Sequence, residues 1–301
     1  MRILVTGATG FLGRNICDAL LQRGHELAGL TRQSGLATSN RGSRYTSITY
    51  TMGDQLPEAA IDFTPEVIVH LAWDGIPDFS EQKCVFNVES QLRFLNETRR
   101  FTALRKIVVA GTCREYGLKQ GACVESESAI PDSYFSWAKQ SLHDFFSLNC
   151  QKRGISLSWF RIFYVYGPSQ REESLIPTLI KAFKTNTAPK ISNPLAVNDY
   201  IYIADVVKAF VMGAENVECE GTFNLGSGRT TSIAEIVRRV EYSINGTDKS
   251  PSDLDSSSSV ENRITSGMWA DLSLSSKLLS WAPEVSLRDG VELTCRLATY
   301  E

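Results

Sequence analysis

Short apolar runs alternate with longer amphipathic stretches through the first half of the chain. The runs cover residues 3–6, 26–30, 67–71, 106–110 and 156–160, and helical patterns between them include residues 12–23 and 85–101. The first helical pattern ends before Gly24, a residue type that commonly follows a helix. Runs that are apolar throughout are typical of strands covered by helices on both faces. The alternation therefore predicts an α/β fold with a Rossmann-type, doubly wound parallel sheet.

A glycine-rich turn follows the first predicted strand and opens the first predicted helix. Gly7, Gly10 and Gly13 occur in the segment Thr-Gly-Ala-Thr-Gly-Phe-Leu-Gly. Gly7 permits a tight turn, Gly10 lets the backbone approach a pyrophosphate, and Gly13 lets the helix pack close to the sheet. The N–H groups and positive dipole end of the helix would then bind the phosphates. The order of strand, glycines and helix predicts a dinucleotide site.

The composition narrows the function classes further. The chain has 301 residues, of which 43% are hydrophobic, as in an ordinary globular protein. Its net charge of −3 provides no basic excess for a phosphate backbone, so we expect no nucleic-acid partner. No apolar run reaches the length that spans a bilayer, so we expect no membrane association. Seven cysteines without a CxxC pair indicate reduced thiols and a cytoplasmic location, and three separated histidines argue against a metal site.

A series of short motifs follows the glycine-rich turn in order. They are Gly53-Asp54, Val69-His70-Leu71-Ala72, Asn87-Val88, Gly111-Thr112, Tyr116-Gly117, Ala138-Lys139, Tyr166-Gly167-Pro168, Asp199-Tyr200, Phe223-Asn224-Leu225-Gly226 and Trp281-Ala282-Pro283. With these motifs the chain resembles, over nearly its whole length, the extended short-chain dehydrogenase/reductase family of nucleotide-sugar epimerases, dehydratases and 4-ketoreductases. The resemblance implies a dinucleotide-binding domain over residues 1–166 and a smaller C-terminal substrate-binding region over residues 167–301. It also implies that the chain returns to the sheet around residues 199–228.

The resemblance also assigns residues to the cofactor. It implies that Asp54 contacts the adenine, that Leu71 and Ala72 contact the dinucleotide backbone, and that Asn87 contacts a loop near the nicotinamide. A plain turn residue is the alternative interpretation of Asp54. His70 ends a buried strand, and we interpret it as a packed, hydrogen-bonded histidine. The expected cofactor residues are Gly7, Gly10, Phe11, Leu12, Gly13, Thr31, Arg32, Asp54, Leu71, Ala72, Asn87, Lys139 and Phe163.

The end of the second predicted strand bears on the choice of cofactor. Sites that prefer NAD usually carry Asp or Glu there, which binds the ribose hydroxyls and would repel a 2′-phosphate. This chain has Thr31 and Arg32 instead, and both residue types can bind a phosphate. A solvated loop arginine is the alternative interpretation of Arg32. We therefore predict NADP in preference to NAD, with NAD as the alternative.

The resemblance implies a catalytic helix with a Tyr-x-x-x-Lys pair and a Ser or Thr at the end of the preceding strand. In such a site the tyrosine exchanges a proton with the sugar oxygen, and the lysine holds the ribose and lowers the tyrosine pKa. Thr112 and Lys139 match the hydroxyl residue and the lysine, but Phe135 stands where the tyrosine is expected. Tyr134, one position earlier, lies ~140° from Lys139 around a regular helix.

Phe135 leaves three interpretations open. The sequence carries an engineered Tyr-to-Phe change, or the protein has lost its chemistry and retained nucleotide binding. In the third interpretation another group supplies the proton, and the candidates are Tyr134, Thr112, Cys113 and a water molecule.

The residues after Thr112 bear on the type of reaction. Family dehydratases carry Asp-Glu directly after this position, whereas this chain has Cys113 and Arg114, so dehydration is disfavoured. We expect Glu115 to pair with neighbours of Arg114 or with a surface partner. Reduction needs only a reduced cofactor and a proton donor, so we predict an NADP-dependent nucleotide-sugar 4-ketoreductase that reduces an NDP-4-keto-6-deoxyhexose. The alternatives are an NAD-dependent nucleotide-sugar 4-epimerase and a catalytically impaired nucleotide-sugar-binding protein.

Substrate recognition departs from the family pattern. Tyr164 and Asn198 replace an Asn and an Arg that commonly touch the nucleotide or the diphosphate, and Arg171 is a candidate replacement. The candidate substrate residues are Cys113, Arg114, Tyr164, Arg171 and Asn198. A nucleotide diphosphate-sugar is therefore the predicted substrate class, and a small ketone is the runner-up.

Two predicted helices carry more apolar residues than a sheet face needs. They cover residues 85–101 and 134–152 and include Phe94, Leu95, Leu142, Phe145 and Phe146. The resemblance implies that such helices pair between two copies as a four-helix bundle, so we predict a homodimer. The alternative is that all of these residues belong to the core of one chain.

Overall fold

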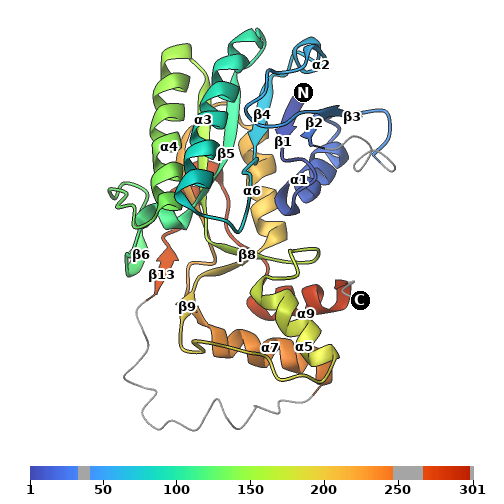
Figure 1. Cartoon of the computed structure of the whole chain (residues 1–301), viewed down its shortest axis with the longest axis vertical. Coiled ribbons are helices and arrows are strands. Elements are labelled where there is room, and N and C mark those ends of the chain that lie inside the picture. Colours follow the sequence, from blue (N-terminus) through green and yellow to red (C-terminus); the bar gives the residue numbers. More distant parts are fainter. Residues whose placement is uncertain (33–40, 247–266, 299–301) are drawn as a thin grey trace.

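The computed structural model describes residues 1–32, 41–246 and 267–298. Its centre is a parallel sheet of seven strands in the order β11-β7-β5-β4-β1-β2-β3 (Figure 1). The strands are β1 (Arg2–Thr6), β2 (Glu26–Thr31), β3 (Tyr45–Thr49), β4 (Val67–His70), β5 (Lys106–Thr112), β7 (Ser156–Ile162) and β11 (Gly221–Leu225). The strand order reverses between β1 and β4, where doubly wound folds form a ligand crevice at the carboxyl ends of the strands. The predicted Rossmann-type α/β fold is confirmed.

Helices cover both faces of this sheet. α1 (Phe11–Gln22) and α6 (Ile203–Glu215) share one apolar core, and α3 (Glu81–Glu97) and α4 (Tyr134–Arg153) share the other (Figure 1). Successive residues of a strand point to opposite faces, so β1 places Ile3 and Val5 in the first core and Leu4 in the second. The shorter helices and turns are α2 (Glu58–Asp62), η1 (Thr98–Arg100), η2 (Cys113–Tyr116) and α8 (Ser273–Leu279). Among the described residues, no helix combines the length and the apolar character that crossing a membrane requires.

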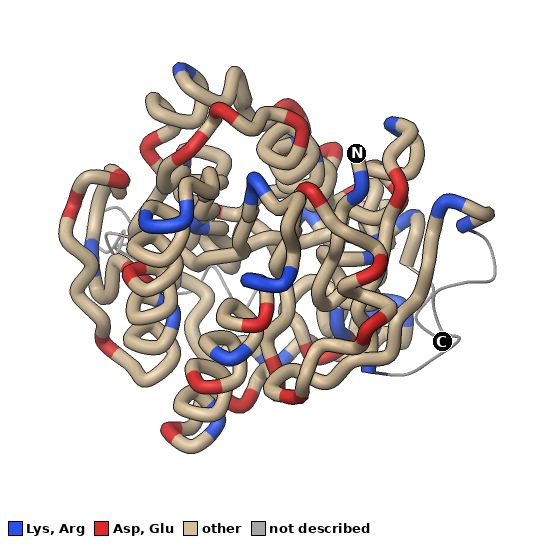
Figure 2. The backbone as a smooth tube through the Cα atoms, turned by 90° about the horizontal axis from the view of Figure 1, so that it is seen from above, with Lys and Arg blue, Asp and Glu red and all other residues tan. Residues whose placement is uncertain are grey.

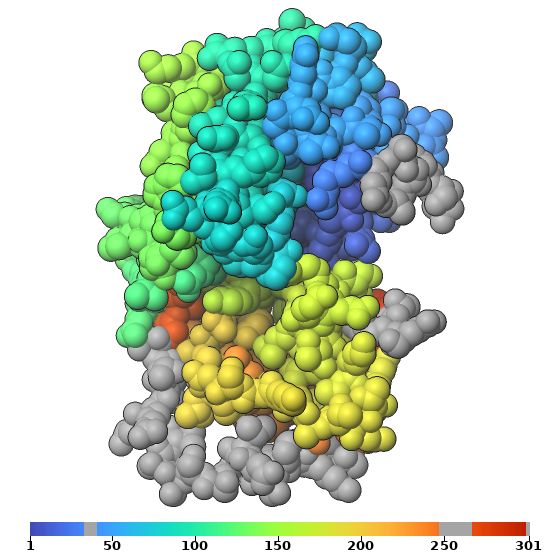
Figure 3. Space-filling model, in the orientation of Figure 1, coloured from blue at the N-terminus to red at the C-terminus, as the bar shows by residue number. Residues whose placement is uncertain are grey.

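A smaller lobe lies next to the carboxyl ends of the strands (Figures 1 and 3). Its helices are α5 (Leu175–Lys184), α7 (Ile233–Asn245) and α9 (Leu287–Leu297), and they enclose a third apolar core. Three short ladders connect the lobes: β8 (Tyr164–Tyr166) with β10 (Tyr200–Tyr202), β9 (Val197–Asn198) with β12 (Thr231–Ser232), and β6 (Gly121–Cys123) with β13 (Met268–Ala270). Between these segments α6 and β11 return to the large sheet. The proposed division into residues 1–166 and 167–301 therefore describes the order along the chain, and residues 203–225 of the second part pack with the first.

The bounds of α3 differ from the sequence prediction. The helix begins at Glu81 rather than at residue 85, and it ends at Glu97 rather than at residue 101. The side chain of Ser80 accepts a hydrogen bond from the N–H of Lys83, which caps the earlier start. The chain then tightens into the 3-10 turn η1, which ends the helix early.

The apolar residues expected at a dimer surface are mostly core residues. Phe94, Leu95, Leu142 and Phe146 are buried within the chain, so this part of the prediction was wrong; Phe145 is exposed. A helical pattern alone does not show which apolar face meets the sheet, because both faces of these helices carry large apolar side chains. The exposed apolar residues of α3 and α4 are Val85, Phe86, Tyr134, Trp137, Phe145 and Leu148.

Lys106 is a fully buried lysine at the start of β5. Its Nζ donates hydrogen bonds to the hydroxyls of Ser156 (3.0 Å) and Ser158 (2.8 Å) and to the carbonyl of Cys219. These partners are neutral, so the ammonium is held by dipoles rather than by a carboxylate. Burial lowers the pKa of Lys106 to about 8, from the 10.5 that is usual for a lysine.

We expect Lys106→Met to change how stability depends on pH. Between about pH 8 and the unfolded pKa near 10.5, the unfolded wild-type chain binds a proton at Lys106 that the folded chain has released. The wild type should therefore gain stability relative to Lys106→Met across this window, by at most about 1.4 kcal/mol per pH unit. Other groups titrate in both proteins and cancel in the difference. Urea unfolding of both proteins at pH 7.0, 8.5 and 9.5 measures this difference in stability. A difference that stays the same at all three pH values would contradict the prediction.

Candidate active site

The glycine-rich turn forms a close-packed cradle between β1 and α1. Gly7 has a φ of +67°, and Gly10 precedes α1 as its N-cap. A Cβ at Gly13 would lie 2.1 Å from the carbonyl oxygen of Gly7, and a Cβ at Gly7 would lie 3.2 Å from the backbone of Ala72. No side chain of the described residues caps α1, whose first turn includes Phe11 and Leu12. The cradle therefore fits a dinucleotide, because its glycines leave the backbone open at a helix N-terminus that favours phosphate.

Thr6 and His70 join the cradle to the end of β4. The Thr6 hydroxyl accepts hydrogen bonds from the N–H groups of Leu71 (3.0 Å) and Ala72 (3.1 Å) and lies 2.9 Å from His70 Nδ1. His70 Nε2 lies 2.9 Å from the side-chain oxygen of Gln91. Burial lowers the pKa of His70 to about 4. His70 is thus a packed, neutral, hydrogen-bonded residue, which confirms that interpretation.

The other expected cofactor residues lie around the same end of the sheet. Thr31 is buried at the end of β2, and the guanidinium of Arg32 forms an ion pair with Asp74. Asn87 is buried in α3 and binds the backbone of the loop after β4, so it holds that loop in place. Asp54 is exposed, and its N–H closes a turn onto the carbonyl of Thr51.

Lys139 lies in α4 at the end of β5. Its side chain is buried, its Nζ donates a 2.9 Å hydrogen bond to the carbonyl of Ala110, and the ammonium lies 4.5 Å from the centre of the Trp73 ring. Burial lowers the pKa of Lys139 to about 8, while the charge of Glu115 opposes this shift. The structure thus keeps a cation beside the strand end that carries Thr112.

Phe135 packs in an aromatic group beside Lys139. Its ring meets Trp73 edge-on, with 5.1 Å between the ring centres, and lies 4.4 Å from the ring centre of Phe79. Phe135 and Lys139 therefore both contact Trp73, as their spacing along one face of α4 predicts. Trp73 and Phe79 lie in the loop between β4 and α3, and neither belongs to a motif that sequence analysis identified.

Tyr134 points elsewhere. It is the first residue of α4, its side chain is exposed, and its hydroxyl lies within hydrogen-bonding reach of Glu81 at the start of α3. Ser133 caps α4 through the N–H of Ser136, so the helix begins regularly. The structure does not bring Tyr134 to Lys139.

Thr112 ends β5 and begins the turn η2. Its hydroxyl oxygen accepts a 3.3 Å hydrogen bond from the N–H of Arg114, and its own N–H donates to Glu115 at 2.8 Å. A hydroxyl that accepts one bond keeps its proton for donation. Thr112 can therefore donate to a substrate oxygen at this strand end.

Glu115 lies in the turn η2 and is buried rather than exposed at the surface. Its carboxylate accepts hydrogen bonds from Arg161 Nε (2.8 Å) and from the indole N–H of Trp159 (3.0 Å). The expected surface partner was wrong, because the counter-ion of Glu115 is Arg161, which lies in the adjacent strand β7 and is also buried; the bond from the N–H of Thr112 does fall next to Arg114. A carboxylate held in this way is not free for acid–base work on a sugar.

The candidate substrate residues fall into two groups. Arg114 forms a 2.6 Å ion pair with Asp132, and the hydroxyl of Tyr164 lies within hydrogen-bonding reach of Arg114. Tyr164 contacts Tyr200, whose hydroxyl accepts from Asn198 at 3.3 Å. The structure therefore brings Arg114, Tyr164 and Asn198 together.

The other two candidates and Phe163 lie differently. Cys113 and Phe163 are buried in one small apolar cluster, and burial raises the pKa of the Cys113 thiol, so neither side chain faces a solvent-accessible site. Placing Cys113 among the substrate contacts was therefore wrong for its side chain. Arg171 lies exposed in the loop between β8 and α5.

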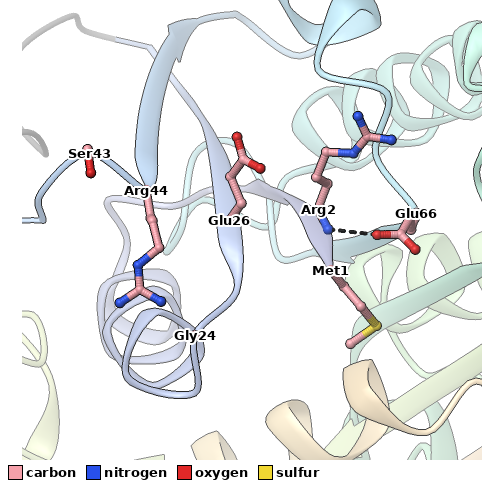
Figure 4. Close-up of a pocket in the computed structure, with 7 residues that line it drawn as sticks. All are labelled: Met1, Arg2, Gly24, Glu26, Ser43, Arg44 and Glu66. Carbon is pink, nitrogen blue, oxygen red and sulfur yellow. Dashed lines mark hydrogen bonds between the residues drawn. The ribbon is translucent and has the colours of Figure 1, made fainter.

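One cavity lies away from these residues. It has a volume of about 470 Å³ and is lined by Met1, Arg2, Gly24, Glu26, Ser43, Arg44 and Glu66 (Figure 4). Arg2 and Glu26 begin β1 and β2, and the N–H of Arg2 donates to Glu66 at 2.9 Å. The cavity therefore opens at the amino ends of the strands, opposite to the cradle, and we assign it no part in catalysis.

Comparisons with known proteins agree with this arrangement. A model of the NAD dependent epimerase/dehydratase family matches residues 3–226. An uncharacterized UDP-glucose epimerase, YtcB, of Bacillus subtilis is 29% identical over 97% of this chain and 96% of its own. The dTDP-4-dehydro-6-deoxyglucose reductase of Escherichia coli is 22% identical over 96% of this chain and 95% of its own. The structure of UDP-glucuronic acid 4-epimerase from Bacillus cereus in complex with NAD superimposes with a TM-score of 0.82, at 26% identity, over 99% of this chain and 96% of that one.

Proposed function

Because the chain belongs to the NAD dependent epimerase/dehydratase family, we propose that it reduces the C4 ketone of a nucleotide-activated 4-keto-6-deoxyhexose with NADPH. The observation that carries this proposal is the buried Lys139 beside Thr112, at the strand ends next to the glycine cradle. Dehydration would need free carboxylates after Thr112. Those positions hold Cys113 and Arg114, and Glu115 is paired with Arg161. Of the reactions considered, ketone reduction requires the fewest catalytic groups that are missing from this site.

In this proposal each residue of the site has a separate role in binding or catalysis. The α1 N-terminus binds the phosphates, and the Lys139 ammonium binds the ribose hydroxyls. A bound nicotinamide dinucleotide supplies the hydride. Thr112 donates a hydrogen bond to the C4 oxygen, where negative charge develops. Since Phe135 has no hydroxyl, water or Thr112 must deliver the proton, so we expect slow turnover.

Preference for NADP is supported by the end of β2, where Thr31 and Arg32 stand in place of a carboxylate. A nucleotide-sugar substrate is supported by the named relatives. A 4-epimerase that uses NAD is the second candidate, because YtcB and the superimposed structure are both named as epimerases. A nucleotide-sugar-binding protein without turnover is the third, because Phe135 packs where the catalytic tyrosine is expected.

One set of measurements separates the three functions. Single-turnover oxidation of NADPH with dTDP-4-keto-6-deoxyglucose tests reduction, and calorimetry compares the affinities for NADP and NAD. We expect slow but measurable reduction and tighter binding of NADP. Interconversion of UDP-glucose and UDP-galactose with bound NAD would instead establish epimerisation, and binding of both ligands without either reaction would establish the third function.

The location and partners follow the same proposal. All seven cysteines are free thiols, which supports a reducing, cytoplasmic environment. Acidic and basic residues are intermixed along the described backbone, which favours a small-molecule partner over a nucleic acid (Figure 2).

We further propose a homodimer that pairs α3 and α4 between two copies through their exposed apolar residues. Phe86→Glu should give a monomer, because the interface would have to bury a carboxylate in place of an apolar ring. Leu297→Glu on α9 is the matched control, since Leu297 is also exposed but lies in the small lobe. Light scattering at micromolar concentration should give twice 33.4 kDa for the wild type and the control. A wild-type monomer would contradict the proposal.

A further inference from the structure

A three-residue ion cluster joins the end of β2 to the loop after β4. The Asp74 carboxylate accepts from Arg32 Nη1 at 3.0 Å through one oxygen and from Lys83 Nζ at 2.7 Å through the other. Both cations thus share one carboxylate, and the cluster carries a net charge of +1. Arg32 is largely exposed, with 74% of its side chain accessible, whereas Asp74 and Lys83 are about one-third exposed or less.

The cluster lies across the strand that leads into the glycine cradle. β1 lies between β2 and β4, and Thr6 at its end is opposite Leu30 on one side and His70 on the other. Arg32 follows β2 directly, and Asp74 lies shortly after β4. The ion pair therefore spans the carboxyl end of β1. An Asp or Glu at the end of β2 usually binds the adenosine ribose of NAD in this region, and Asp74 brings a carboxylate there from a different strand.

Asn87 holds Asp74 in this position through the backbone. The Asn87 side-chain oxygen accepts from the N–H of Asp74 at 2.8 Å, and its nitrogen donates to the carbonyls of Asp74 (2.9 Å) and Lys83 (2.8 Å). Asn87 itself is buried in α3. The loop position therefore does not depend on the Asp74 carboxylate, and the carboxylate can be neutralised without releasing the loop.

We propose that Asp74 sets the balance between NADP and NAD by competing with a 2′-phosphate for Arg32. Asp74 uses only Nη1 of Arg32, so a 2′-phosphate that binds the other N–H groups lies close to the Asp74 carboxylate, which repels it and offsets part of the guanidinium charge; a ribose hydroxyl can instead donate to the same carboxylate. Asp74 thus weakens the NADP preference that Arg32 would otherwise give and lets the site accept both cofactors. This inference rests on the proposed function in one respect, namely that the cradle binds a nicotinamide dinucleotide.

Calorimetric titration of the full chain with NADP and with NAD tests the inference. Asp74→Asn should tighten NADP binding about three- to tenfold, the range expected for release of one partly exposed ion pair plus loss of repulsion, and should leave NAD within about twofold. Asp78→Asn is the matched control, because it removes the same charge from the same loop, where Asp78 accepts from Ser80. It should leave the affinity ratio unchanged.

Arg32→Gln completes a double-mutant cycle. It should weaken NADP binding, and in its background Asp74→Asn should change the ratio of NADP to NAD affinity clearly less, because only the direct repulsion remains to be removed. An unchanged ratio in Asp74→Asn, or an equal change with and without Arg32, would overturn the inference while both cofactors still bind. Failure of the wild type to bind either dinucleotide would overturn the proposed function and this inference together.

Discussion

The Phe135→Tyr variant is expected to reduce a 4-keto nucleotide-sugar about 10²–10⁴-fold faster than the wild type in a single turnover. Hydride addition to the C4 carbon leaves negative charge on the oxygen, and a positioned phenol neutralises that charge with its proton. Phe135 and Lys139 both contact Trp73, so a hydroxyl added at this position stands near the ammonium. The positive charge stabilises the phenolate that forms.

Rapid mixing with NADPH, followed by its absorbance, measures this rate. Sugar affinity should change little, because the ring already packs against Trp73 and Phe79. Tyr134→Phe is the matched control: it removes a hydroxyl from the adjacent position, which faces Glu81, and should leave the rate unchanged. Thr112→Val in the Phe135→Tyr background should lower the rate again. Equal rates for Phe135 and its tyrosine variant would show that the proton reaches C4 by another route.

The Glu115→Ala variant is expected to lose about 3–5 kcal/mol of the free energy of unfolding. The side chains of Glu115 and Arg161 are 0% and 4% exposed, so removal of the carboxylate leaves the guanidinium buried without its counter-ion. It also removes the acceptor of the Trp159 indole N–H and of the Thr112 N–H. Urea unfolding at pH 7 gives the change.

Replacing both members of the ion pair shows whether the lost stability comes from the unpaired charge or from lost packing. Glu115→Leu combined with Arg161→Met removes both charges and should recover a large part of the lost stability, because a buried ion pair can often be replaced by apolar side chains at little cost. A Glu115→Ala variant that keeps wild-type stability but loses all turnover would contradict the structural role and make Glu115 a catalytic residue.

The central sheet could be predicted from the sequence because its inner strands are apolar throughout. β1, β2, β4, β5 and β7 each begin within one residue of a predicted run. β3 was not predicted because its sequence, Tyr-Thr-Ser-Ile-Thr, has only two apolar residues, which are separated by two polar ones. β11 lies within residues 199–228, where the resemblance implied a return to the sheet. The start of α3 is marked by the capping residue Ser80, a signal that an apolar pattern does not contain.

The parts of the site that could be predicted are those in which spacing along the sequence is enough to bring residues together. The cradle glycines and the common helix face of Phe135 and Lys139 follow from positions close together in sequence, and the resemblance to the extended short-chain dehydrogenase/reductase family is confirmed. The pairing of Glu115 with Arg161 was not predictable, since it depends on the register of β5 and β7. The same holds for Asp74, whose partner Arg32 is distant in sequence and meets it only once the strand order is known.

The path of the chain between the two lobes constrains how this fold can be recombined. The small lobe is assembled from three separate helical segments, α5, α7 and α9, and the chain leaves it twice, once for α6 and β11 and once for β13 and α8 (Figure 1). A truncation after residue 166 would therefore remove β11 from the edge of β7 and α6 from its core beside α1. The small lobe therefore cannot be exchanged between relatives as one contiguous segment. A chimera needs matched junctions on both sides of α6–β11 and of β13–α8.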